Sequence, residues 1–204
     1  MAETPAAPGT RERLIAAMTD ALRRRGLHGI GLTELLAQAG APKGVLYHHF
    51  PGGKTELAVA AIDDVVVRML GWLDGLLARN ADPIEAARQW MQGATVRLSS
   101  TGFHAGCPLA TVALESTPDD HALREALARA FATLRERIAL ALEQHGEPRA
   151  QAQGIAALIV ATYEGGLLQA RVAQSSDPIN LATQTLLSLL AARGPTAART
   201  GEPS

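Results

Sequence analysis

The two lysines of this 204-residue chain, Lys43 and Lys54, are its most informative chemical groups. Pro42 suits the first position of a helix, and Pro51-Gly52-Gly53 breaks the chain just before Lys54, so each lysine is expected where a helix begins. A cation there opposes the helix dipole by about 0.3–1 kcal/mol, whereas the backbone N–H groups of a helix start bind phosphate. The placement therefore favours an anionic partner such as a nucleic-acid backbone. Compositional bias in an arginine-rich chain is the alternative explanation for two surviving lysines.

The elements that must position these lysines are helices. A first helix is expected from Thr10, as its N-cap, to Gly26, with Arg23 to Arg25 as a solvated basic end. Two short helices, at 32–39 and about 42–49, are separated by a glycine-containing turn. Two such helices have the shape of a helix-turn-helix.

Helical periodicity continues to the C-terminus, and no period-two strand pattern interrupts it. The further helices are expected at about 54–76, 83–98, 106–115, 121–142, 149–174 and 178–193. The sequence thus predicts an all-α fold of about nine helices. We divide it into a three-helix helix-turn-helix domain (1–55), a helical ligand-binding and dimerisation domain (56–193) and a flexible tail (194–204).

Composition sets bounds on function. Hydrophobic residues make up 47% of the chain and aromatic residues 3%, which favours a core of helices packed closely on small side chains. The net charge is −1, but residues 1–58 hold seven Lys/Arg against five Asp/Glu, which places the basic footprint at the N-terminus. A single cysteine excludes an intrachain disulfide and a multi-cysteine metal site. With no secretory h-region and no apolar run of membrane-spanning length, we expect a soluble, intracellular protein.

The segment from Ala39 to Phe50 (AGAPKGVLYHHF), followed by Pro-Gly-Gly-Lys54, resembles the DNA-binding segment of TetR-family transcriptional regulators. The doubled glycine before Lys54, GCPLA at 106–110 and EGGLL at 164–168 are similar to the LmrA/YxaF-like branch. This resemblance covers nearly the whole chain. It implies a homodimer whose N-terminal domains enter adjacent major grooves of a palindromic operator in double-stranded DNA, and a C-terminal core whose small-molecule effector releases the DNA.

The resemblance also assigns the DNA contacts. The residues concerned are Thr33, Lys43, Gly44, Val45, Tyr47, His48 and Lys54. Many relatives begin the helix before the turn with a phosphate-binding threonine where this chain has Gly31, and whether Thr33 replaces that contact is left open. Val45 stands where a hydroxyl residue is common, and a valine there suits a thymine methyl group. Exchanging Lys54 for Glu is expected to weaken all DNA binding without unfolding the protein.

The aromatic side chains of this segment have separate expected roles. Tyr47 is expected to reach a phosphate with its phenol while its ring packs on the domain, the alternative being a core tyrosine. His48 and His49 are adjacent, so they cannot point the same way on a helix, and His48 is the better placed for DNA. Phe50 is expected to pack the turn against the first helix.

Apolar residues of the central helices predict an effector cavity suited to a hydrophobic or aromatic molecule. Its expected lining is Trp72, Trp90, Met91, Phe103, Cys107, Leu109, Tyr163 and Glu164. Interior glycines cost about 1 kcal/mol each relative to alanine, so Gly165 and Gly166 indicate a close approach of backbones, either at the dimer interface or in the cavity wall. The expected dimer interface comprises Leu158, Gly165, Gly166, Leu186 and Leu190.

Other functions were weighed against this one. His104 and Cys107 suggest a metal or nucleophile site, but two ligands are too few for a closed zinc site, and a small buried cysteine is the simpler interpretation. An all-α binding protein or enzyme using the region of His104, Cys107 and Glu164, and a structural dimerisation module, are the rivals. We predict a bacterial cytoplasmic, nucleoid-associated repressor with no catalysis, cofactor or metal.

Overall fold

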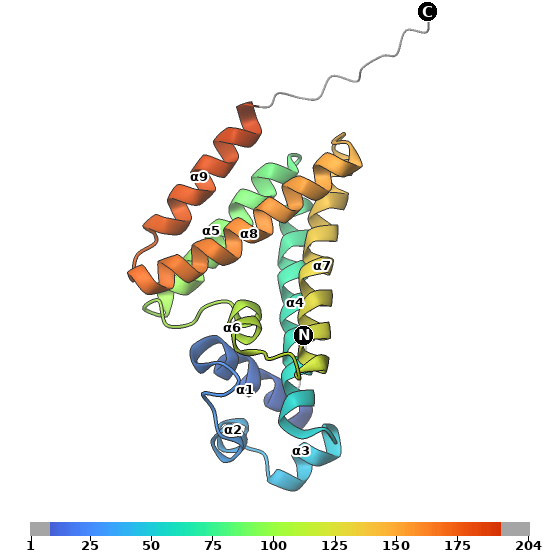
Figure 1. Ribbon diagram of the computed structural model, residues 1–204, viewed down its shortest axis with the longest axis vertical. Coiled ribbons are helices and arrows are strands. Elements are labelled where there is room, and N and C mark those ends of the chain that lie inside the picture. The colour runs from blue at the N-terminus through green and yellow to red at the C-terminus, as the bar shows by residue number, and fades with distance from the viewer. Residues whose placement is uncertain (1–8, 193–204) are drawn as a thin grey trace, which may run out of the picture.

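The computed structural model describes residues 9–192 of the chain, and this part contains nine helices and no strand (Figure 1). The helices are α1 (Thr10–Arg25), α2 (Leu32–Ala39), α3 (Lys43–His49), α4 (Gly53–Leu77), α5 (Pro83–Ser100), α6 (Pro108–Glu115), α7 (His121–Gln144), α8 (Arg149–Ala173) and α9 (Asp177–Ala192). The all-α prediction is confirmed, with helix ends displaced by a few residues. The expected tail at 194–204 lies outside the described residues.

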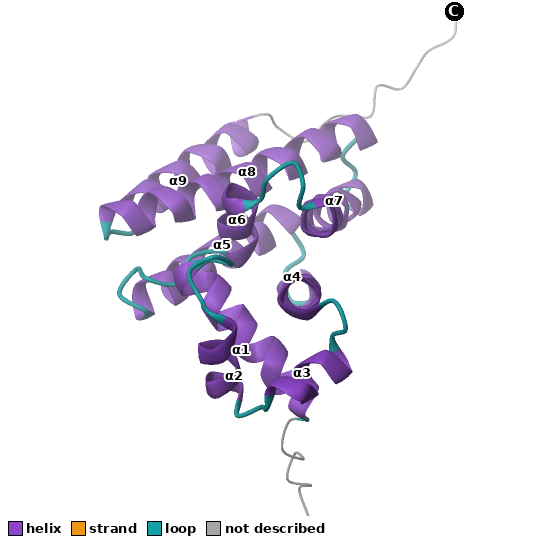
Figure 2. Cartoon of the chain, turned by 60° about the horizontal axis from the view of Figure 1, so that its bottom comes forward, coloured by secondary structure: helices purple, strands orange, loops and turns teal. Residues whose placement is uncertain are grey.

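Helices α1, α2 and α3 cluster at one end of the molecule, and α4 leads from them alongside α7 (Figure 1). Helices α8 and α9 pack against each other at the opposite side, away from α2 and α3 (Figure 2). Helix α6 is short and lies between α1 and the longer helices, and it contacts both α1 and α7. Helix α6 thereby connects α1 to the longer helices.

Local capping decides where the N-terminal helices begin. The N-cap of α1 is Gly9 rather than Thr10, and the N–H of Gly9 donates to Glu12 Oε2 at 3.0 Å. Pro42 is the N-cap of α3, with extended backbone at φ −71° and ψ 153°, so Lys43 is the first helical residue. The cap of α1 thus lies one residue before the expected one, and Pro42 caps α3 instead of occupying its first helical position. Gly40 ends α2 in the left-handed region, as the sequence predicts.

Helix α8 corrects one expectation. Its 25 residues, with a mean hydropathy of 1.2 in the most apolar window, are long and apolar enough to cross a membrane by length and composition. No uninterrupted apolar run marks this helix in the sequence, because polar residues are scattered through it. In the fold α8 packs against α5, α7 and α9, so it needs apolar residues on several sides.

The close approach expected at the paired glycines occurs within one chain. A Cβ added at Gly166 would lie 2.8 Å from Cγ1 of Ile179 and 3.2 Å from its Cα, so α8 and α9 cross in contact at this glycine. Leu186 of α9 is also buried, at 4% exposure. We therefore place Gly166 and Leu186 in the packing of α8 on α9 rather than on a dimer interface.

Candidate nucleic-acid interface and effector cavity

The outward face of α3 carries four of the residues predicted to contact DNA. Lys43, Gly44, Tyr47 and His48 are all exposed, and their spacing places them on one side of the helix. The opposite side is anchored by Leu46, which is fully buried. Helix α3 therefore presents a cation, a phenol and an imidazole around a position that has no side chain.

Tyr47 is held by the glycine that opens α4. Gly53 has φ +69°, and a Cβ there would lie 3.3 Å from Cε1 of Tyr47. A non-glycine residue at this position would be strained and would press on the ring. Tyr47 remains 45% exposed, so its ring rests on the domain while part of it stays open to a partner.

The end of α3 is fixed by Phe50. This ring is 2% exposed, and the guanidinium of Arg11 lies 5.4 Å from its centroid, which confirms the expected packing against α1. The rings of His48 and His49 meet edge-to-face at 5.0 Å, with His48 exposed and His49 half-buried. The two side chains differ in exposure, and His48 is the more open to a partner, as the helical geometry predicts.

Lys54 has a structural role that the sequence did not reveal. Its Nζ donates to the carbonyl oxygens of Leu27 and Ile30, at 2.6 and 2.5 Å. Burial lowers the pKa of Lys54, and the charge of Glu115 acts in the opposite direction. Two of its three N–H donors are thus used to hold the α1–α2 connection against α4, and its contact with DNA stays a prediction.

The two remaining predicted DNA residues lie on different parts of the helix-turn-helix. Thr33 is exposed in the first turn of α2, and Val45 is half-buried on α3. Both positions are compatible with the roles that the resemblance implies. Both roles stay predictions.

The C-terminal end of α1 is attached to helices outside the DNA-reading segment. The N–H of Gly106 donates to the carbonyl of Arg23 at 3.1 Å, and the N–H of Leu27 donates to Glu115 Oε2 at 2.5 Å. Nη2 of Arg171, on α8, donates to the carbonyl of Arg24 at 3.3 Å. This junction connects α1 to α6 and α8.

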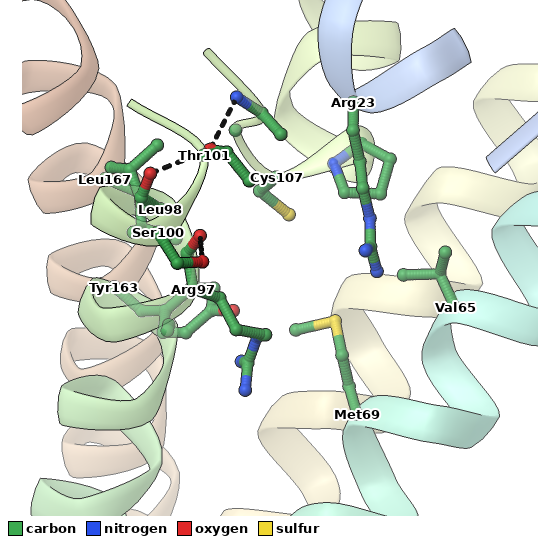
Figure 3. Close-up of a pocket in the computed structure, with 14 residues that line it drawn as sticks. Arg23, Val65, Met69, Arg97, Leu98, Ser100, Thr101, Cys107, Tyr163 and Leu167 are labelled. Carbon is green, nitrogen blue, oxygen red and sulfur yellow. Dashed lines mark hydrogen bonds between the residues drawn. The ribbon is translucent and has the colours of Figure 1, made fainter. Parts of the chain in front are cut away.

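A cavity of about 190 Å³ lies beside this junction (Figure 3). Its lining includes Arg23, Met69, Arg97, Thr101, Cys107 and Tyr163. A second cavity of about 150 Å³ shares Gly106, Cys107 and Leu167 with the first and adds Glu164. Three predicted lining residues, Cys107, Tyr163 and Glu164, therefore border one or both cavities.

The other predicted lining residues do not border these two cavities. Trp90, Met91 and Leu109 are at most 1% exposed and belong to the core, while Trp72 and Phe103 are half-buried outside both walls. The ring of Trp90 stacks on that of Tyr163 with centroids 4.2 Å apart. Trp90 thus fills the volume behind the cavity wall instead of facing the cavity.

Cys107, which is buried, and Glu164, which is partly exposed, form a pair in the wall of the second cavity. The Cys107 thiol donates to Glu164 Oε1 at 3.2 Å, and burial raises the pKa of the thiol well above its ordinary value. Burial also raises the pKa of Glu164 to about 7, although the thiol hydrogen bond acts against this rise. The thiol stays protonated at neutral pH, so this geometry does not support a cysteine nucleophile.

Metal binding by the neighbouring residues was the other alternative. His104 is exposed whereas Cys107 is buried, so the two side chains lie in different environments. Within residues 9–192, no group of three or more His, Cys, Asp or Glu side chains is placed to hold a metal ion.

Arg23 and Arg97 are the charged residues among the lining residues of the first cavity that the sequence did not predict. Three consecutive helical residues point in three directions, and here Arg24 pairs with Asp20 while Arg25 pairs with Glu34. Arg23 turns inward instead. The available signal was its register, since it follows the buried Leu22 on the inner side of α1.

Comparison with known proteins agrees with both parts of this structure. Residues 14–61 match the family described as bacterial regulatory proteins, tetR family, and residues 83–185 match the C-terminal domain of LmrA/YxaF-like transcriptional regulators. An uncharacterised HTH-type transcriptional regulator of Mycobacterium tuberculosis is 34% identical over 94% of this chain and 99% of its own length. The HTH-type transcriptional regulator LmrA of Bacillus subtilis is 29% identical over 83% of this chain and 90% of its own.

The fold has solved counterparts. One of them is the reduced form of NemR from Escherichia coli, an HTH-type transcriptional repressor. It superposes on this chain with a TM-score of 0.73 at 28% sequence identity, and the match covers 88% of this chain and 96% of NemR. Sequence, domain matches and fold agree on one conclusion: the chain belongs to the TetR family of bacterial transcriptional regulators, with a C-terminal domain of the LmrA/YxaF-like type.

Proposed function

We propose that this regulator is a homodimeric repressor that binds a palindromic operator through α3 and releases it when a small molecule occupies the cavity beside α1. The observation that carries the proposal is the attachment of the end of α1 to α6 and α8 at the cavity. Residues 1–55 read DNA in this proposal, and residues 56–193 bind the effector and dimerise.

The DNA contacts are divided by chemistry. Lys43, Tyr47 and His48 supply phosphate contacts from the exposed face of α3, and these give affinity rather than base specificity. Gly44 has open space around the position of a Cβ, which allows the groove to approach the backbone. Val45 meets a thymine methyl group. Thr33 supplies a hydroxyl to phosphate from the first turn of α2.

The dimer interface is assigned to the outer faces of α8 and α9. These faces carry large apolar side chains that are 46–80% exposed in one chain: Leu158, Leu168, Val172, Leu181 and Leu189. Exposed apolar patches of this kind mark protein interfaces, and a two-fold dimer buries the same patch on both chains. Gly165 and Leu190, both partly exposed, complete the predicted interface.

The mechanism is a shift between two dimer conformations. In one the two α3 helices have the spacing of adjacent major grooves, and in the other they do not. An effector that binds the second conformation better lowers operator affinity by the ratio of its two affinities. The regulator acts where its DNA is, in the bacterial cytoplasm at the nucleoid.

The test is footprinting on the DNA that flanks the gene for this protein. We expect protection of an inverted repeat, with affinity falling steeply as salt increases because phosphate contacts release counterions. Lys43→Glu should remove protection, whereas Arg129→Glu, a change in an exposed pair on α7, should leave protection intact. A folded dimer that protects no DNA at any ionic strength would refute the proposal.

The rival enzymatic function has weaker support. It needs a convergent acid, base or metal set, and the pair of Cys107 with Glu164 offers a protonated thiol instead of a nucleophile. Turnover of a substrate that is lost in Cys107→Ser would favour the rival. The family membership favours the regulator.

A further inference from the structure

Two arginines face the cavity beside α1 without a carboxylate to neutralise them. Arg23 descends from α1 and Arg97 extends from α5 (Figure 3). Among the residues that the structure describes, no Asp or Glu borders this cavity. Glu164, the nearest candidate, borders the neighbouring cavity and accepts a hydrogen bond from Cys107.

The contacts of Arg23 show an unbalanced charge. Among residues 9–192, its guanidinium forms no ion pair, while Arg24, Arg25 and Arg68 each have a carboxylate partner. Burial lowers the pKa of Arg23, and the positive charges of Arg68 and Arg97 lower it further. A half-buried cation that faces other cations is unfavourable unless an anion joins it.

Within residues 9–192, Arg97 contacts neutral aromatic side chains, one outside the cavity wall and one in it. Its guanidinium lies 4.2 Å from the ring centroid of Trp72. It also approaches the hydroxyl of Tyr163, and burial raises the pKa of that phenol so that the phenol carries no charge at neutral pH. The aromatic ring orients this guanidinium and leaves its charge unneutralised.

The other residues of the cavity wall indicate the chemistry of the rest of the ligand. Val65, Met69, Leu98 and Leu167 are apolar, and Thr101 adds a hydroxyl. A guanidinium forms a planar fork that matches a carboxylate better than a point charge does. The volume of about 190 Å³ exceeds that of a 150 Å³ apolar cavity that admits benzene, so a benzoate-sized body is accommodated.

We infer that this cavity binds a small organic acid, with its carboxylate between Arg23 and Arg97 and its aromatic or short aliphatic body on the apolar wall. The inference adds a chemical class of effector to the proposed function. It rests on that function only in calling the bound acid an effector. It revises the expectation of a purely hydrophobic ligand. Because Arg23 belongs to α1, a carboxylate that binds its guanidinium acts directly on the DNA-reading segment.

The test is calorimetric titration of the wild-type dimer without DNA at pH 7.5. The probes are sodium benzoate and sodium hexanoate, with benzamide and hexanamide as uncharged counterparts and benzylamine as a cation. At least one acid should bind saturably, and at least about tenfold more tightly than its amide, because hydrogen bonds to charged groups are the stronger ones. Equal binding of acid and amide, preference for benzylamine, or no saturable binding of either acid up to millimolar concentration would overturn the inference.

Variants identify the groups responsible. Arg23→Gln and Arg97→Gln should each weaken acid binding by about tenfold or more and leave amide binding unchanged. Arg129→Gln, which removes an exposed arginine of α7, is the matched control and should bind like wild type. Circular dichroism verifies folding, and Arg97→Gln serves if Arg23→Gln fails to fold. Unchanged acid affinity in folded Arg23→Gln or Arg97→Gln would overturn the assignment.

The readout separates this inference from the proposed function. Acid binding is measured without DNA, so it does not depend on an operator. Acid binding in a dimer that protects no DNA would refute the repressor and keep the site. Operator protection in a dimer that does not discriminate acid from amide would refute the site and keep the repressor.

Discussion

Replacing Lys54 by methionine separates a structural lysine from a DNA-binding one. The substitution keeps the length of the aliphatic stem and removes the ammonium group. That group donates to the carbonyls of Leu27 and Ile30, so the change leaves both acceptors without their partner. From sequence alone, exchanging Lys54 for Glu was expected to weaken DNA binding without unfolding the protein. The structure predicts a loss of stability as well.

The magnitude follows from the two hydrogen bonds. A hydrogen bond to a charged group contributes about 1.5–3 kcal/mol, and two that share one donor group are not additive. Lys54 is only partly buried, so water can replace some of what is lost. We expect the free energy of unfolding to fall by about 2–3 kcal/mol. For a protein of this size that lowers Tm by about 4–12 °C.

Thermal unfolding followed by circular dichroism at 222 nm measures this loss. Variants are compared at equal protein concentration, because the stability of a dimer depends on it. Lys43→Met is the matched control, since Lys43 is exposed on α3 and its removal should change stability by less than about 0.5 kcal/mol. If Tm of Lys54→Met fell no further than that of Lys43→Met, the two carbonyl bonds would not stabilise the fold and the reasoning would fail.

Three further predictions use other parts of the structure. Lys43→Met should reduce the slope of log Kd against log salt by about 0.9 per lost phosphate contact, or about 1.8 per dimer, in fluorescence anisotropy, and an unchanged slope would contradict the contact. Burial raises the pKa of Glu164 from 4.5 to about 7. As pH rises, the Glu164 carboxyl therefore ionises in the unfolded chain at a lower pH than in the folded protein. Stability is therefore lost between these values, by up to about 3 kcal/mol. The Tm advantage of Glu164→Gln over wild type should grow from pH 5 to pH 8, and parallel curves would exclude this linkage. Gly166→Ala should destabilise by about 1–3 kcal/mol through its clash with Ile179, whereas Gly154→Ala, with open space on the same helix, should stabilise by up to about 1 kcal/mol; equal Tm shifts would argue against close packing at Gly166.

Helical periodicity predicted the fold well because burial of one face is the dominant signal in an amphipathic helix. The α2 range of 32–39 agrees with the structure, and the other helices differ mainly at their ends. Those ends depend on which residue supplies the cap. At α1 the backbone N–H of Gly9 bonds the Glu12 carboxylate, so the hydroxyl of Thr10 is not the cap that the residue type suggested.

The candidate sites were predicted less evenly. The exposure of the α3 residues follows from their positions on one short helix, and the spacing in the sequence gives those positions. The lining of the cavity depends on how five helices meet, which sequence spacing does not give. Trp90 illustrates the difference: a large aromatic residue gains most by complete burial, so it packs under Tyr163 instead of lining the cavity.

The polar contacts of α1 and α4 indicate how a ligand in the cavity changes DNA binding in the proposed mechanism. Within the reading segment, Lys54 ties α4 to the α1–α2 connection, and Arg25 bonds Glu34 at 2.8 Å to tie α1 to α2. These bonds connect α1, the α1–α2 connection, α2 and α4 within the segment. Its polar links to α6 and α8 are the bonds from Gly106 to Arg23, Leu27 to Glu115 and Arg171 to Arg24.

Each of these three links includes a residue that borders a cavity. Arg23 and Gly106 line the first cavity, and Glu115 and Arg171 line the second. In the proposed mechanism, a ligand that repositions any of them changes the angle of the reading segment rather than its internal structure. Since the two α3 helices of a dimer must match the spacing of successive major grooves, a small rotation at each junction is sufficient to lower operator affinity.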